Sequence, residues 1–306
     1  MADDLKDILR LPPVLYHRIA RWCDKRTWDS LSKTSKAWRF QCLAAKFRFS
    51  RIKIDDNQLG MEGALRVFNY GRRDPKLDAF RCFVKRAVFI VRGRVIPPGP
   101  RVDPDLDVPE EQDTPLEDLP ASLADALFRL KNLQSLTLLL ENFSAEQVDS
   151  LNFAFSQKEV IWRKVHSLRI KAPTEVVKSV ISSCDPGVLT AINLYKWHGS
   201  EEFAALKKVK RLKRLRLLYD DDNGTLPSST LPCASEDLWH ALHSLYIETG
   251  KSLEWLILHE KRNRNRSRIT HIYQLDQLIA TINFNIKKLK EVKRFAFSLQ
   301  SKRVAD

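Results

Sequence analysis

The chain has 306 residues, of which 43% are hydrophobic and 29% are charged, and its formal net charge is +14. A chain of this length and composition is expected to fold in solution, with one sizeable core and a small appended domain. Its apolar runs, such as residues 136–140, are far shorter than the ~18 residues of a membrane span, and the first residues lack the basic and apolar parts of a signal peptide. We therefore expect a soluble protein with no membrane partner.

Cysteine and histidine usage argues against a disulfide framework and against a metal site. The cysteines are odd in number and scattered along the chain, at Cys23, Cys42, Cys82, Cys184 and Cys233. No pair has the C-x-x-C spacing of a zinc site, and His240 and His243 are the only histidines that lie close in sequence. We expect a reducing, intracellular compartment, either cytoplasm or nucleus, and no metal or cofactor.

The first fifty residues contain two short helical patterns with large apolar side chains. These side chains recur at helical spacing, first at Leu15, Ile19 and Trp22 and then at Trp28, Leu31 and Trp38. Pro12 and Pro13 stand where a helix can start, because proline has no N–H to lose in the first turn. Short helices bury little surface, so we expect some of these side chains to stay exposed unless another protein covers them.

This segment, over residues 8–47, resembles the F-box, the motif by which substrate receptors dock onto the Skp adaptor of cullin-RING ubiquitin ligases. A Leu-Pro pair, the helical hydrophobes and a terminal Trp-Arg pair carry the resemblance. It implies binding to a Skp-family adaptor, and through it to a cullin, by Leu11, Pro12, Leu15, Ile19, Trp28, Leu31 and Trp38. The alternative is an ordinary N-terminal helical cap that packs on the rest of the chain.

Residues 1–50 are therefore predicted to form an F-box-like helical module, and residues 51–96 a bridging helix and a first strand. The next segment, residues 97–120, is rich in proline and acidic residues. Both residue types disfavour helix propagation and burial, so this segment is predicted to form a loop.

One short apolar pattern recurs along the rest of the chain. An apolar residue is followed by two more, three and five positions later, in copies that begin at Val84, Leu133, Val165, Leu189, Leu212, Leu253 and Val292. Alternation over the last positions is typical of a short strand with one buried face. Helical patterns lie between several copies, at residues 145–155, 175–183, 201–208, 236–249 and 276–290. We expect Gly250 to end the fourth of these helices in the left-handed conformation.

Successive strand–helix units of this kind stack so that each covers its neighbour, with parallel strands inside and helices outside. The units resemble leucine-rich repeats, and nearly all the chain is similar to fungal F-box proteins with leucine-rich repeats. The resemblance implies an α/β fold in which a three-helix F-box-like module precedes an irregular solenoid, with residues 121–306 as a degenerate repeat arc. An unrelated open α/β domain is the alternative, because buried parallel strands give similar apolar runs.

Basic residues concentrate in two segments of the second half. In residues 206–217 they alternate with leucine and valine and are expected on the solvent side, whereas residues 261–268 contain no apolar residue and are predicted to form a solvated loop. The strand positions expected to be exposed include Ile257 and the candidate target-binding residues Arg169, Asn193 and Arg216. This mildly basic surface would suit an acidic protein segment.

The chain contains no glycine-rich phosphate loop and no nucleophile elbow, so no catalytic residue is predicted and we expect no enzyme activity. The function implied by the resemblance is substrate recognition in an SCF-type E3 ubiquitin ligase, with an unknown protein target. Two alternatives stay open. One is a basic repeat protein that binds nucleic acid, and the other is an F-box scaffold that holds partners without promoting their degradation.

Overall fold

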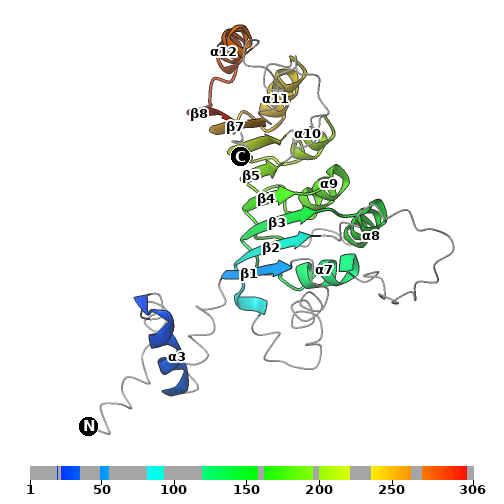
Figure 1. The fold of residues 1–306 in the computed structure, drawn as a ribbon, viewed down its shortest axis with the longest axis vertical. Helices are drawn as coiled ribbons and strands as arrows, with labels where there is room; N and C mark the ends of the chain where they lie inside the picture. The colour runs from blue at the N-terminus through cyan, green and yellow to red at the C-terminus, as the bar shows by residue number, and fades with distance from the viewer. Residues whose placement is uncertain are drawn as a thin grey trace, which may run out of the picture.

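The structure is a computed structural model, and it describes residues 19, 22–34, 49–54, 81–92, 119–157, 162–195, 200–220, 236–262 and 271–301. Within these residues, eight strands form one parallel sheet whose order follows the chain from β1 to β8. They are β1 (Phe49–Ile54), β2 (Arg86–Arg92), β3 (Ser135–Glu141), β4 (Ser167–Lys171), β5 (Ala191–Tyr195), β6 (Arg214–Asp220), β7 (Trp255–Arg262) and β8 (Arg294–Ser301). Figure 1 shows the strands stacked from blue β1 to red β8.

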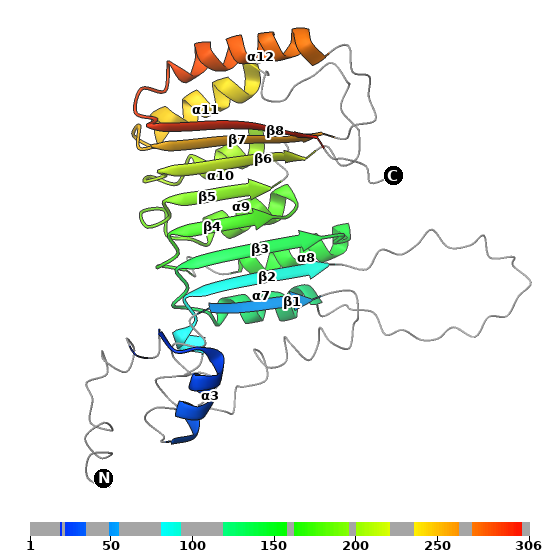
Figure 2. The ribbon, with the colours of Figure 1, turned by 60° about the vertical axis from the view of Figure 1, so that its left-hand side comes forward.

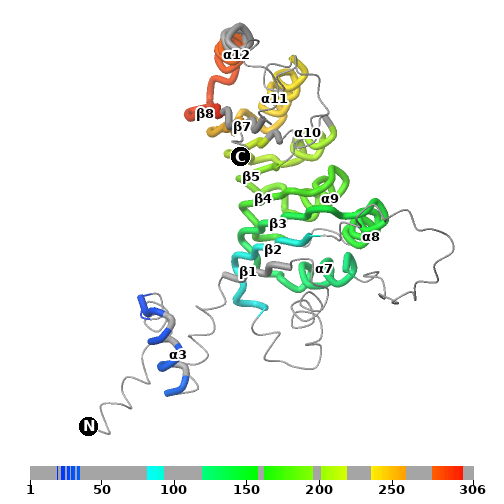
Figure 3. The backbone as a smooth tube through the Cα atoms, viewed as in Figure 1, coloured from blue at the N-terminus to red at the C-terminus, as the bar shows by residue number. Residues whose placement is uncertain are grey.

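Helices connect most of the strands and lie on one side of the sheet. They are α7 (Leu119–Phe128), α8 (Ala145–Ser156), α9 (Thr174–Ser182), α10 (Ser200–Leu206), α11 (Glu236–Glu248) and α12 (His271–Ile286), while α3 (Lys25–Thr34) precedes β1. Neighbouring helices from α7 to α11 contact one another in chain order, and Figure 1 shows them along the same face of the sheet. The backbone tube in Figure 3 follows the resulting coil from unit to unit.

All seven predicted strands are confirmed, as β2 to β8. The first six copies of the pattern bury the same three positions, and the three residues of the seventh copy are half-buried. The leading residue of the first six copies, from Val84 to Leu253, is at most 1% exposed. The backbone carbonyl of the residue after this leading residue accepts two backbone N–H groups. One comes from the residue just before the next strand, and the other comes from the first residue of that strand. Gln134 and Ser135 donate to the Lys85 carbonyl at 2.7 and 3.0 Å, and the same bonding recurs in every later unit. The sequence repeat is therefore also a repeat of backbone hydrogen bonds.

Two helix ends show how local sequence fixes the bounds of an element. Ser144 caps α8: its hydroxyl accepts the Gln147 N–H at 3.2 Å, and the Gln147 side chain accepts the Ser144 N–H at 3.1 Å. Gly250 follows α11 with a φ of 67°, which confirms the predicted left-handed end. The Lys251 N–H closes this end on the Tyr246 carbonyl at 2.8 Å. The five predicted helices are present as α8 to α12.

Three elements correct the sequence prediction. The pattern misses β1, because Ser50 stands where an apolar residue is required and pairs in register with Ala87. It also misses α7, which begins inside the predicted loop 97–120; Pro120 is buried in the first turn of this helix, where proline is tolerated. Finally, β7 extends to Arg262, so the predicted basic loop 261–268 starts within a strand.

A buried tryptophan joins three consecutive units of the coil. Trp162 is fully buried, and its Nε1–H donates to the Leu127 carbonyl on α7 at 3.3 Å. Its ring lies 6.0 Å from the ring of Phe155 on α8, which meets Phe128 edge-on at 5.3 Å. The backbone of Trp162 forms a parallel bridge with Cys184, which follows α9. Trp162 therefore connects α7, α8 and the segment that follows α9.

The sequential strand order and the one-sided helices fit a solenoid-like α/β fold. A doubly wound sheet would carry helices on both faces and reverse its strand order at a switch point. Neither feature occurs within the described residues. No helix in the same residues is both long enough and apolar enough to cross a bilayer.

Candidate functional site

The face of the sheet opposite the helices is left uncovered by the described helices (Figure 2). We call this surface the open face. Side chains alternate along a strand, so the residues between the buried positions point to it. Two rows cross it in register from β2 to β8. The first row is Arg86, Ser135, Ser167, Ala191, Arg214, Trp255 and Arg294, and the second row is Val88, Thr137, Arg169, Asn193, Arg216, Ile257 and Ala296.

The three predicted target-binding residues lie side by side in the second row. Arg169 on β4 pairs in register with Asn193 on β5, which pairs with Arg216 on β6. Arg169 is exposed, and the other two side chains are half-buried. The Asn193 Oδ1 and the Arg216 Nε are shielded from solvent and have no hydrogen-bond partner among the described residues. A buried polar atom that stays unpaired lowers stability by about 1–3 kcal/mol, so each of these atoms would gain from a partner.

Arginine side chains stack on two aromatic rings of the open face, Trp255 and Tyr195. Trp255 on β7 lies between Arg214 on β6 and Arg294 on β8, whose guanidinium carbons are 4.8 and 4.3 Å from the ring centroid. Arg169 lies over the ring of Tyr195 at 5.0 Å. Planar guanidinium groups stack well on aromatic faces, and stacking restricts their rotation. The rings therefore hold these arginines in place with their hydrogen-bonding edges available.

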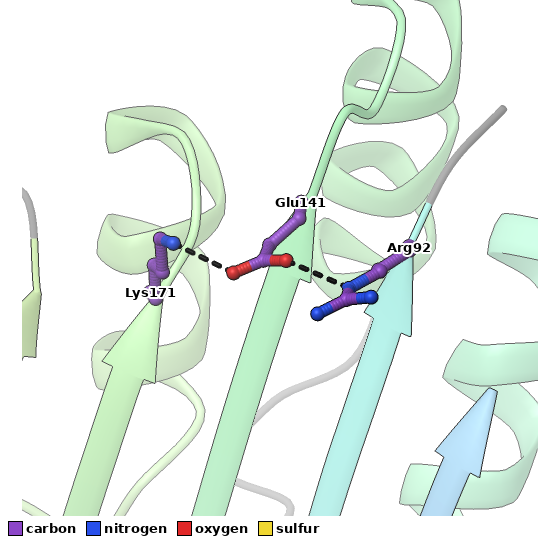
Figure 4. A network of polar contacts seen from close by, with 3 residues as sticks. All are labelled: Arg92, Glu141 and Lys171. Carbon is purple, nitrogen blue, oxygen red and sulfur yellow. Dashed lines mark hydrogen bonds and ion pairs between the residues drawn. The ribbon is translucent and has the colours of Figure 1, made fainter. Parts of the chain in front are cut away.

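A network of charges closes one end of the open face (Figure 4). Glu141 at the end of β3 accepts a hydrogen bond from the Lys171 Nζ at 2.7 Å and from the Arg92 Nε at 3.0 Å. The bond from Lys171 is the main reason that the pKa of Glu141 is lowered from its usual value, and Arg92 adds to the effect. The single negative charge of Glu141 therefore offsets one of these two positive charges, and the network keeps a net charge of +1.

The described basic side chains of the open face lie on alternate strands. They occur on β2, β4, β6 and β8, as Arg86, Arg92, Arg169, Lys171, Arg214, Arg216 and Arg294. Asn193, Tyr195 and Trp255 lie on the strands between them. Because neighbouring strands are ~4.8 Å apart, described basic residues of one row on alternate strands are separated by about 10 Å.

The structure describes only part of the predicted adaptor-binding set. Leu11, Pro12, Leu15 and Trp38 lie outside the described residues, and Trp28 lies on α3. Leu31 on α3 is half-buried, and Ile19 is 39% exposed. Trp22, from the same apolar pattern as Ile19, is 89% exposed. Two large apolar side chains of the predicted module are therefore in contact with solvent.

Sequence reasoning found the second row but missed the arginine–tryptophan stack. Strict alternation after each leucine is enough to predict that Arg169, Asn193 and Arg216 point outward. Recognising that Trp255 meets Arg214 and Arg294 requires the register between three strands. Aligning the copies of the pattern on their leading residues would have supplied that register, because all three residues stand two positions after it.

No cluster of three or more potential metal ligands occurs among the described residues. Cys184 is buried, and burial raises the pKa of its thiol to about 12, which leaves it protonated and unreactive at neutral pH. No protein-family model matches the chain, and no curated protein matches it either. The resemblance to F-box and leucine-rich-repeat proteins therefore stays a prediction from the sequence.

Proposed function

We propose that this protein binds a target protein on its open face and serves as the substrate-recognition subunit of a Skp–cullin–F-box ubiquitin ligase. The observation that supports target binding most directly is the row of Arg169, Asn193 and Arg216. Two cations flank Asn193 there, and the Asn193 Oδ1 and Arg216 Nε have no partner among the described residues. Helices cover the other side of the sheet, so the open face is the surface that strand residues present to a partner.

Adaptor docking is supported by the F-box resemblance of residues 8–47. The exposed side chains of Ile19 and Trp22 are consistent with a surface that a partner covers, because contact between large apolar groups and water is unfavourable. In this proposal the chain does no covalent chemistry. Its contribution is proximity, since a target held near the conjugating enzyme reaches a high effective concentration.

The proposal is tested by co-expression of the full chain with a Skp adaptor. We expect the two proteins to co-purify, and we expect a Leu11→Ala/Pro12→Ala variant to lose the complex with its far-UV circular dichroism unchanged, because these residues precede the predicted first helix. Phe153→Ala is the matched control, since Phe153 is an exposed apolar residue on α8, away from the predicted module. Absence of a complex with the wild-type chain refutes the ligase function.

Nucleic-acid binding is the second candidate, favoured by the net charge of +14 and by the arginines of the open face. Binding through phosphate contacts has a distinct signature, because affinity then falls linearly with salt on a logarithmic scale. Retention on a polyanion resin that fades steeply with salt, together with no adaptor binding, would place this function first.

A further inference from the structure

The spacing of cations on the open face specifies the shape of a ligand. In the second row, Arg169 on β4 and Arg216 on β6 stand two strands apart, which separates them by about 10 Å. In the first row, Arg214 on β6 and Arg294 on β8 have the same separation. A polyproline II helix has three residues per turn and rises ~3.1 Å per residue, so every third side chain returns to one side after about 9 Å. In an extended β-strand, side chains on one side repeat every ~7 Å, which matches the ~10 Å separation of the arginines less well.

We propose that the open face binds an acidic segment in the polyproline II conformation, which crosses the strands and presents a carboxylate at every third residue. Arg169 and Arg216, which stand two strands apart in the second row, face two successive carboxylates of this series. Arginine pairs with carboxylate through two parallel hydrogen bonds, which gives both strength and a fixed orientation. The inference rests on the proposed function only in taking the open face as the target site, and it adds the conformation and charge spacing of the target.

The unpartnered atoms of the second row favour a peptide over a nucleic acid. The Asn193 Oδ1 requires a donor, and the adjacent Arg216 Nε requires an acceptor. A polyproline II backbone makes no internal hydrogen bonds, so it offers both N–H and C=O groups to a partner. A phosphodiester backbone offers acceptors alone and would leave the Asn193 Oδ1 without a donor.

The aromatic residues of the face point to the same class of ligand. Proteins that bind single-stranded nucleic acid stack bases on open aromatic rings. Here Arg214 and Arg294 approach Trp255 from the strands on either side, and Arg169 covers one side of Tyr195. These rings therefore stack on arginine side chains and are not open platforms for bases. A pre-ordered guanidinium loses less conformational entropy when it binds a carboxylate.

The test measures binding of the full chain to two labelled peptides of identical composition. One repeats the triplet Glu-Pro-Pro, and the other carries the same residues with its glutamates clustered. We expect the triplet peptide to bind at least about tenfold more tightly, because only it places successive carboxylates at the separation of Arg169 and Arg216. Equal affinity for the two peptides overturns the proposal.

Two double variants separate the open face from net charge. Replacing Arg169 and Arg216 by glutamine should remove the preference for the triplet peptide. Replacing Lys208 and Arg211 by glutamine removes the same charge from exposed positions in the turn after α10, and it should preserve that preference. Equal losses in both variants would mean that binding follows total charge, contrary to the proposal.

Asn193→Leu keeps every charge and removes the unpartnered acceptor. It should weaken binding of the triplet peptide and leave binding of a single-stranded oligonucleotide unchanged. An oligonucleotide of equal charge that binds more tightly than the triplet peptide overturns the proposal in favour of nucleic acid. Adaptor co-purification is measured on the same proteins: the arginine variant should keep the adaptor, and the Leu11→Ala/Pro12→Ala variant should keep the peptide. Each of the two proposals can therefore fail alone.

Discussion

Trp162→Ala should destabilise the centre of the coil more than any single change at its surface. The side chain is fully buried, packs against Phe155 on α8 and donates to the Leu127 carbonyl on α7. Truncation of a buried tryptophan removes its apolar contacts and leaves a cavity, at a cost of about 3–5 kcal/mol. Since small domains have about 5–15 kcal/mol of total stability, the variant should lose a large part of it.

Two further substitutions serve as controls. Trp162→Phe isolates the contribution of the indole hydrogen bond, and Trp22→Ala tests the effect of losing an exposed tryptophan. Trp162→Phe keeps an aromatic ring, and the Leu127 carbonyl still accepts the Leu130 N–H at 3.1 Å, so we expect a loss of only about 1–2 kcal/mol. Trp22→Ala removes an indole that is 89% exposed and should change the free energy of unfolding by less than about 0.5 kcal/mol.

Urea unfolding followed by circular dichroism measures these differences, and hydrogen exchange locates them. Repeat units contact only their neighbours, so amides in β3, β4 and β5 should lose protection before those in β7 and β8. A Trp162→Ala variant that loses less than about 1 kcal/mol, or uniform exchange across all strands, would refute the role assigned to this residue.

Two more measurements test the electrostatics of single groups. The pKa of Glu141 should lie below its ordinary value of 4.5, because Lys171 and Arg92 stabilise the carboxylate. That stabilisation is present above the pKa of the unfolded chain and is lost as pH falls through the lowered pKa of the folded state. Unfolding at decreasing pH should therefore show a smaller loss of stability in Glu141→Gln than in the wild type, and an NMR titration giving a pKa of 4.5 or higher would contradict the reasoning. Cys184, whose thiol pKa burial raises to about 12, should resist alkylation until the chain unfolds, whereas the exposed Cys82 should react in the folded protein; peptide mapping that finds both labelled at equal rates would show that Cys184 is accessible.

The seven strands that carry the leucine pattern could be predicted from sequence because the pattern is local. Three apolar positions in a window of six residues fix both the strand and the direction of its buried face. β1 does not follow this rule, since Ser50 stands in register with Ala87, where the pattern has an apolar residue. α7 is not predicted, for a different reason. Pro120 indicates a loop in the sequence, and it is compatible with a helix only because the helix begins at Leu119.

The candidate site could be predicted only in part, because its geometry combines residues that are distant in sequence. The outward direction of Arg169, Asn193 and Arg216 follows from alternation within each strand. Their contact with one another depends on the register of β4, β5 and β6, and the unpartnered atoms become visible only once neighbouring side chains are placed. A pattern within one strand carries no information about that register.

The arrangement of cations on the open face is not what folding requires. The core needs apolar residues at the inward positions alone, and any polar residue satisfies the outward ones. Like charges directly opposite one another on neighbouring strands are destabilising, and here Asn193 separates Arg169 from Arg216 while Trp255 separates Arg214 from Arg294. This alternation limits repulsion and keeps the positive potential. Stacking on Trp255 then orders the arginines before any partner arrives, which is the property that a binding surface needs and a folding core does not.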